Sequence, residues 1–157
     1  MNDQTPGTGQ AAQPLVISHE NSLGKLRALG WEPRTIYDIG AFQGVWSDRV
    51  RRIFPDSEII QFEANAENAP ALAHRGFRHF LTALAAEDND TRIFFAAKNA
   101  VATGNSLYRE NTAFYAGENL ILRQVVTRRL DSLVAEHKLN PAQLIKIDVQ
   151  GAELEVI

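Results

Sequence analysis

The sequence predicts an α/β fold in which helices flank a mostly parallel β-sheet. Three observations predict it: short apolar runs of strand length alternate with segments of helical periodicity, a glycine turn follows the first run, and acidic side chains stand at or just after the ends of three runs. Strands joined through helices form right-handed parallel crossovers, and such sheets bind ligands beyond the carboxyl ends of their strands. The residues that follow the strands are therefore the expected functional residues.

The first part of the chain alternates helix, strand and helix. Residues 22–29 are expected to form a short helix, because Gly30 is placed to end it. Residues 35–39 form a β-branched and apolar run, which predicts a buried strand. Residues 45–54 carry apolar side chains at helical spacing and are followed by a proline, which predicts a second helix.

The middle of the chain continues the alternation. Residues 58–62 form a second apolar run and predict a strand. Residues 67–75 are expected to form a helix that the next glycine closes, with its proline in the first turn. Residues 78–85 and 92–97 read as two strands around the polar turn at 87–90.

The last part begins with residues 101–119, whose mixed polarity and turn-forming residues predict a long loop. Residues 124–130 resemble a strand. Asp131 and Ser132 are candidates to cap a helix that runs to about residue 138. Residues 144–148 predict another buried strand, and a further helix is expected from residue 151.

Composition narrows the function classes. The chain has 157 residues, 45% of them hydrophobic, a formal net charge of −3 and no cysteine. A disordered tail is expected over residues 1–20, followed by a single domain over residues 21–157. The absence of a basic block argues against a nucleic-acid partner, and no apolar run reaches the ~20 residues that span a membrane. Without cysteine the chain has no disulfide or thiolate nucleophile, and without a signal peptide we expect a cytoplasmic protein.

The first candidate motif runs from Asp38 to Gly44. Gly40 and Gly44 permit a sharp turn, and with Ala41 they allow the backbone to approach a ligand closely. The following helix N-terminus offers free N–H groups and a partial positive charge, which suit a carboxylate. Asp38 is a candidate partner for an ammonium group. An ordinary turn between strand and helix explains the same residues.

The second candidate motif is Glu63 with Ala64, directly after the strand at 58–62. An acidic residue at this place can accept both hydroxyls of an adenosine ribose, and its distance from the glycine turn fits a strand-helix-strand unit. A dinucleotide site would normally carry a middle glycine, but Gly40 is followed by Ala41 and Phe42. The spacing favours an adenosine ligand that bears an amino acid over a nicotinamide dinucleotide.

The third candidate motif follows the strand at 144–148. A carboxylate at Asp148 would hold a substrate hydroxyl, act as a base or bind a metal. Glu153 is a candidate partner in the first turn of the next helix, where a carboxylate also complements the helix dipole. No compact cluster of ligands predicts a metal site, and we expect none.

These residues resemble the FkbM family of methyltransferases. The resemblance covers residues 35–157 and rests on five segments: Asp38–Gly44, Phe62–Ala64, Gly104–Leu107, Arg129–Leu133 and Lys146–Glu153. It implies a Rossmann-like fold that binds S-adenosyl-L-methionine (SAM). Gln150 stands where many members carry glutamate. The family fold would continue beyond Ile157, so we expect an incomplete domain that lacks its C-terminal strands.

The resemblance implies transfer of a methyl group from the cofactor to a hydroxyl of a sugar or small natural product. Asp148 is the first candidate for the base, and His74 and His79 are weaker candidates. Asn105 and Tyr108, in the loop at 101–119, are candidates to bind the acceptor. Two alternatives stay open: a non-catalytic domain that keeps the fold, and an NAD-dependent oxidoreductase. The sequence makes no prediction of oligomeric state.

Overall fold

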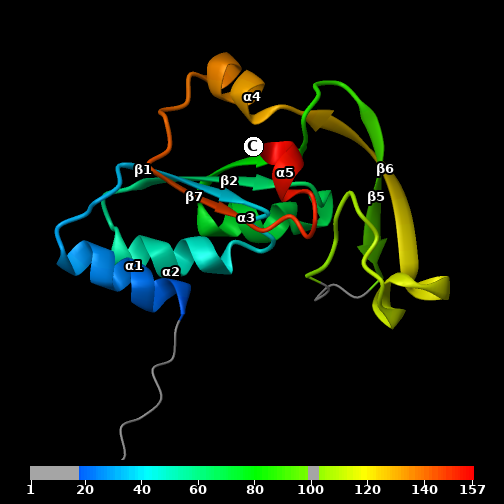
Figure 1. Ribbon diagram of the computed structural model, residues 1–157, viewed down its shortest axis with the longest axis horizontal. Helices are drawn as coiled ribbons and strands as arrows, with labels where there is room; N and C mark the ends of the chain where they lie inside the picture. The colour runs from blue at the N-terminus through cyan, green and yellow to red at the C-terminus, as the bar shows by residue number, and fades with distance from the viewer. Residues whose placement is uncertain (1–17, 99–102) are drawn as a thin grey trace, which may run out of the picture.

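The computed structural model describes residues 18–98 and 103–157, and it confirms the predicted α/β class: helices flank a mostly parallel sheet (Figure 1). The helices are α1 (His19–Ala28), α2 (Val45–Ile53), α3 (Ala69–Arg75), α4 (Leu130–His137) and α5 (Glu153–Val156). The strands are β1 (Thr35–Ile39), β2 (Glu58–Glu63), β3 (Arg78–Leu81), β4 (Ala83–Leu84), β5 (Thr91–Ala97), β6 (Leu120–Arg128) and β7 (Leu144–Ile147).

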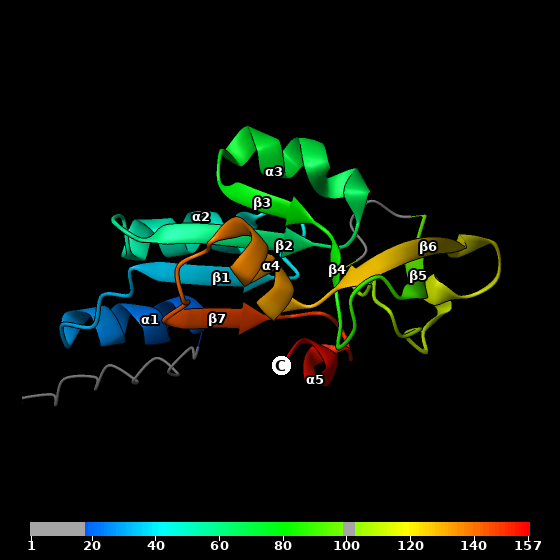
Figure 2. The same ribbon diagram turned by 90° about the horizontal axis from the view of Figure 1, so that it is seen from above.

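The main sheet has the strand order β3-β2-β1-β7, and every neighbouring pair is parallel (Figure 2). Ile36 of β1 pairs with Ile59 of β2 on one side and with Leu144 of β7 on the other. The chain thus moves outward from β1 through β2 to β3 and later returns to the opposite side of β1. The strand order reverses between β1 and β7, which is where open α/β sheets bind ligands.

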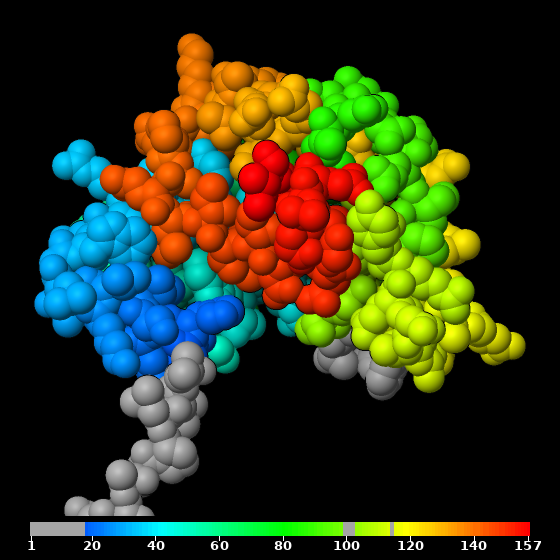
Figure 3. All heavy atoms as spheres, in the orientation of Figure 1, coloured from blue at the N-terminus to red at the C-terminus, as the bar shows by residue number. Residues whose placement is uncertain are grey.

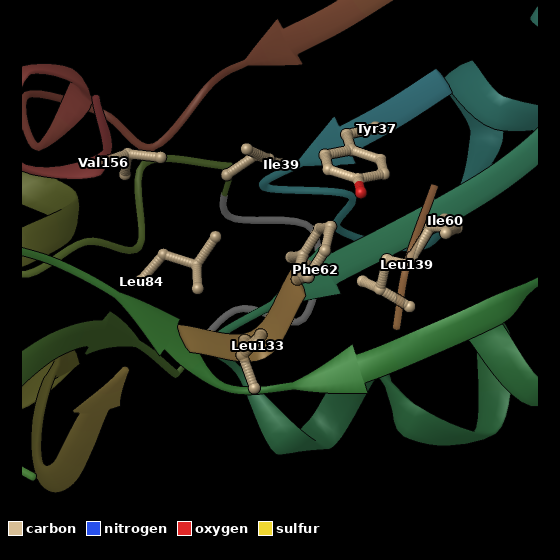
Figure 4. Close-up of a cluster of buried hydrophobic side chains, with 8 residues drawn as sticks. All are labelled: Tyr37, Ile39, Ile60, Phe62, Leu84, Leu133, Leu139 and Val156. Atoms are coloured by element: carbon tan, nitrogen blue, oxygen red, sulfur yellow. The ribbon is translucent and has the colours of Figure 1, made fainter. Parts of the chain in front are cut away.

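Alternate side chains of the sheet point to two covered faces. α1, α2 and α3 lie on one face and α4 lies on the other (Figure 1). Ile36 and Ile59 pack with Val50 and Phe54 of the α2 segment. The opposite face holds a second cluster of buried side chains (Figure 4): Tyr37, Ile39, Ile60, Phe62, Leu84, Leu133, Leu139 and Val156. Because both faces are covered, apolar side chains stand on both faces of β1 and β2, as expected for parallel strands.

β4, β5 and β6 form a separate sheet with the order β4-β6-β5, in which β4 is parallel and β5 antiparallel to β6. The expectation of one strand at 78–85 is wrong, because Thr82 interrupts it, and the strands on either side of the turn at 87–90 do not pair with each other. β6 lies between them. Its partners are distant in sequence, so local alternation gave no sign of this pairing.

The N-terminus of α4 is stabilised from outside the helix. The predicted caps, Asp131 and Ser132, lie inside α4, and the N-cap residue is Arg129, whose side chain makes no capping bond. Asp88 takes that role instead: its Oδ1 accepts from the backbone N–H of Arg129 at 2.9 Å, and its Oδ2 accepts from the hydroxyl of Ser132. These bonds lower the pKa of Asp88, with the Ser132 bond as the largest cause.

The predicted tail at 1–20 lies outside the described residues as far as residue 17. α1 begins at His19, three residues before the predicted start, because the hydroxyl of Ser18 accepts from the backbone N–H of Asn21 at 3.1 Å and caps the helix. The loop predicted at 101–119 contains two short 3₁₀ turns, and its residues 101–102 also lie outside the described part. Within residues 18–98 and 103–157, no helix is long and apolar enough to cross a membrane.

Candidate functional site

A cavity of about 670 Å³ lies at the carboxyl ends of β1, β2 and β7. Its volume is in the range of small-molecule sites. In Figure 3 the surface is hollowed between α1, in blue, and the loop after β5, in yellow-green, with the orange C-terminal segment above. The predicted site residues that line it are Gly40, Ala41, Glu63, Ala64, Asn105 and Asp148. Four others do not: Asp38, Gly44, Tyr108 and Glu153.

The glycine turn forms the floor of the cavity. The N–H groups of Gly40 and Ala41 both donate to the carbonyl of Phe62, at 2.9 and 3.1 Å, so the turn is fixed to the end of β2. Gly40 has φ of +72°, and a Cβ there would lie 2.0 Å from the carbonyl oxygen of Asp148. Only glycine therefore fits between β1 and β7 at this point.

The turn leads into α2 through Gly44, which has φ of +75° and no side chain to cap the helix. The first N–H groups of α2 thus lack a capping side chain, and Val45 and Trp46 line the cavity. A helix end of this kind attracts a negatively charged ligand group. Gly44 therefore acts by placing α2, without itself lining the cavity.

Glu63 ends β2 and is only 7% exposed, yet it faces the cavity. Its two oxygens accept from backbone N–H groups, Oε2 from Phe42 at 2.7 Å and Oε1 from Asn65 at 2.8 Å. Burial raises the pKa of Glu63, while these two bonds, the amide of Asn68 and the charge of Lys146 oppose the rise. The carboxylate is held in one position with lone pairs left to accept ligand hydroxyls.

Asp38 is fully buried, and its two carboxylate oxygens differ: Oδ2 is hydrogen-bonded, whereas Oδ1 makes an ion pair but no hydrogen bond. Its Oδ2 accepts from the hydroxyl of Ser47 at 2.7 Å, and its Oδ1 lies 3.0 Å from Nζ of Lys146. Asp38 does not line the cavity, and its contact with a ligand ammonium stays a prediction. Its side chain points toward α2, below the turn, because Asp38 stands on the same sheet face as Ile36.

Lys146 is a cavity residue that sequence reasoning missed. Its Nζ donates to the carbonyl of Gly40 at 2.7 Å, pairs with Asp38 and lies 3.9 Å from Oδ2 of Asp148. The ammonium thus joins the carboxyl ends of β1 and β7. A sign was present in the sequence: a single charged residue in the apolar run at 144–147 requires a partner, because a buried charge is costly when unpaired.

Asp148 follows β7 and presents its carboxylate at the cavity with the side chain 55% exposed. Its Oδ1 accepts from the side-chain amide of Gln150 at 2.6 Å. Gln150 is in the left-handed region with φ of +55°, in the turn that carries the amide back toward the carboxylate. The second oxygen, Oδ2, lies 3.9 Å from Nζ of Lys146.

Glu153 bonds its own loop. Its oxygens accept from the N–H groups of Val149 at 3.2 Å and Gly151 at 3.0 Å. This is the helix-terminus role that the sequence offered as the alternative to catalysis. Glu153 therefore shapes the segment that follows Asp148 and does not line the cavity.

The loop after β5 closes the cavity from the opposite side. Oδ1 of Asn105 accepts from the N–H of Ala97 at 3.1 Å and from the hydroxyl of Tyr115 at 3.0 Å. Ser106, which is 2% exposed, donates from its hydroxyl to the carbonyl of Val149 at 2.8 Å. Ser106 is a second missed residue, and no local pattern in the sequence indicates its contact with the segment after β7.

Tyr108 turns away from the cavity. Its hydroxyl donates to Glu155 of α5, which also accepts from Arg92 at 3.0 Å, and a Cβ at Gly151 would lie 3.8 Å from Cβ of Tyr108. These contacts hold the loop against α5. Tyr108 does not line the cavity, and its contact with an acceptor stays a prediction.

The weaker candidate bases also lie elsewhere. His74 is in the last turn of α3, and Nδ1 of His79 lies 3.1 Å from the carbonyl of Phe77. Neither lines the cavity. Among residues 18–98 and 103–157, no three histidine, aspartate or glutamate side chains are grouped as a metal site would require.

The fold is an α/β fold with a cavity at the switch point of a parallel sheet. Comparison with family models matches the methyltransferase FkbM domain over residues 38–157. The chain therefore belongs to the FkbM methyltransferase family, and the predicted resemblance is confirmed. Comparisons with curated proteins and with solved structures gave no match.

Proposed function

We propose that the chain binds S-adenosylmethionine and transfers its methyl group to a hydroxyl of a sugar or small natural product. The observation that carries this proposal is the buried carboxylate of Glu63 at the end of β2, facing the cavity beside the glycine turn. Family membership supplies the methyltransferase class. The identity of the cofactor and the class of the acceptor go beyond family membership and are part of the proposal.

The residues of the cavity suit both ends of this cofactor. Glu63 has lone pairs free for ribose hydroxyls, and Ala64 beside it leaves room for an adenosine. The uncapped start of α2 and the ammonium of Lys146 suit the carboxylate of the amino-acid end. When bound, the cofactor would supply a methyl group on a sulfonium, and the neutral thioether S-adenosylhomocysteine would be the leaving group.

Asp148 is the proposed base. A neutral hydroxyl becomes a better nucleophile as its proton is removed, and a positioned carboxylate contributes roughly 10²–10⁴-fold through this step. Asp148 stands at the cavity with one oxygen held by Gln150, which orients the other. The loop at 103–107 lies across the cavity and helps to exclude water.

A methyl-transfer assay tests this function. The chain is incubated with cofactor carrying an isotopically labelled methyl group and a panel of sugars and small hydroxylated compounds. We expect transfer to at least one acceptor, and Asp148→Asn should lower its rate about 100-fold or more while cofactor affinity stays within about twofold. Asp131→Asn is the matched control, because the side chain of Asp131 is 86% exposed on α4. An unchanged rate in Asp148→Asn would reject the assigned base.

A further inference from the structure

The ammonium of Lys146 lies at the cavity with fewer hydrogen-bond partners than it has donors. Its side chain is only 16% exposed, and Lys146 is one of the residues that line the cavity. An ammonium group has three N–H donors. One donates to the carbonyl of Gly40 at 2.7 Å, and Nζ also forms an ion pair with Oδ1 of Asp38 at 3.0 Å, an oxygen that makes no hydrogen bond.

Beyond Gly40 and Asp38, no acceptor among the described residues lies at hydrogen-bonding distance from Nζ. The next acceptor is Oδ2 of Asp148 at 3.9 Å, which is too long for a hydrogen bond. The ring of Trp46 lies 5.9 Å away and covers one side of the ammonium. A nearly buried cation with an unused donor at a cavity is suited to an anionic group on a ligand.

Two neighbouring features favour the same kind of group. The uncapped first turn of α2 lies on the same part of the cavity, since Trp46 belongs to that turn. The carbonyl of Gly40 and the carboxylate of Asp38 are both engaged by Lys146, so they are poor partners for a ligand ammonium. This end of the cavity therefore selects for a carboxylate.

We propose that Lys146, and not Asp38, is the residue that recognises the amino-acid end of the cofactor, by donating a charged hydrogen bond to its carboxylate. The proposal rests on the proposed function, because it assumes an adenosine ligand that carries an amino acid. It gives Lys146 two tasks, since the same ammonium holds the turn at Gly40 and binds the ligand.

Arg49 is the competing cation. It also lines the cavity, but its side chain is 59% exposed and donates to Glu20 at 2.9 Å. Solvent exposure and an existing partner both weaken an interaction with a ligand. The structure therefore favours the buried ammonium over the exposed guanidinium.

Calorimetric titration with two ligands tests the proposal. S-adenosylhomocysteine carries the amino acid, and 5′-methylthioadenosine keeps the adenosine and the sulfur but lacks the carboxylate. We expect Lys146→Met to weaken S-adenosylhomocysteine about 10- to 100-fold and to change methylthioadenosine less than about threefold. Retained binding of methylthioadenosine shows that the cavity is still folded. Lys25→Met, exposed on α1, is the matched control and should change neither affinity.

Lys146→Met leaves the buried Asp38 unpaired, so the double variant Asp38→Asn/Lys146→Met is titrated as well. It should show the same selective loss. Equal loss of both ligands in the double variant would mean that Lys146 acts only through the turn, and would overturn the proposal. A selective loss in Arg49→Met instead would also overturn it. If the wild-type chain binds neither ligand, the proposed function itself fails.

Discussion

The two walls of the cavity are built in different ways. The strand-end wall, made of Gly40, Glu63, Lys146 and Asp148, stands on the carboxyl ends of β1, β2 and β7. The loop wall, made of Asn105, Ser106 and Leu107, follows β5 and belongs to no strand of the main sheet. The hydrogen bonds of the main sheet fix the first wall, whereas a single backbone bridge between Ser106 and Phe95 of β5 and side-chain bonds to distant segments hold the second.

The residues that we assign to the reaction thus lie on one wall, and the residues that close the cavity lie on the other. Every charged group that we assign to cofactor or acceptor lies on the strand-end wall, where the backbone leaves little freedom. The loop wall contributes neutral side chains, and it is fixed through Ser106 to Val149 and through Tyr108 to Glu155. We therefore expect changes on the first wall to disturb the whole domain, and changes on the second to act locally.

The largest effect is expected from Gly40→Ala. The new Cβ would lie 2.0 Å from the carbonyl oxygen of Asp148, and the residue would be held at φ of +72°. We expect the free energy of unfolding to fall by about 3 kcal/mol or more, measured by urea denaturation. Gly24→Ala is the matched control, because nothing lies within 4 Å of its Cβ position in α1, and it should stabilise by about 0.5–1 kcal/mol. A Gly40→Ala protein as stable as the wild type would contradict the close packing of the glycine turn against the end of β7.

A smaller effect is expected from Ser106→Ala. The change removes a bond to the carbonyl of Val149 and one from the N–H of Tyr108, and should cost about 1–2 kcal/mol. Hydrogen exchange should accelerate at Tyr108 while β1 and β2 keep their protection. Ser22→Ala, exposed on α1, should change neither quantity. Equal acceleration in the main sheet would show that the two walls are not independent.

The smallest effect is expected in the pH dependence of stability. Burial raises the pKa of Glu63 above the ordinary value of 4.5, so the folded protein keeps its proton to a higher pH than the unfolded chain. As pH rises above about 4.5, the unfolded chain ionises first, and the free energy of unfolding should fall until Glu63 ionises in the folded state. Glu63→Gln should lack this decline, and the exposed Glu32→Gln should keep it. Identical pH profiles for all three proteins would contradict the raised pKa.

The sequence predicted the strand-end wall more fully than the loop wall. The strand at 35–39 matches β1, and Glu63 and Asp148 lie at the predicted strand ends, because parallel crossovers place such residues along one edge. Lys146 was missed although its place in an apolar run indicated a buried partner. Ser106 and Asp88 gave no local sign, since each bonds a segment roughly 40 residues away. The pairing of β4 with β6 also joins segments that are distant in sequence, so it could not be predicted from local patterns.

The central claim is that the cavity binds an adenosine ligand through Glu63. Calorimetric titration with S-adenosylhomocysteine, with NAD as the control ligand, tests it most directly. We predict saturable binding of S-adenosylhomocysteine alone and a loss of about 10- to 100-fold in Glu63→Gln, because a carboxylate accepts ribose hydroxyls more strongly than an amide. Binding of NAD with equal affinity, or an affinity for S-adenosylhomocysteine that Glu63→Gln leaves unchanged, would contradict the claim.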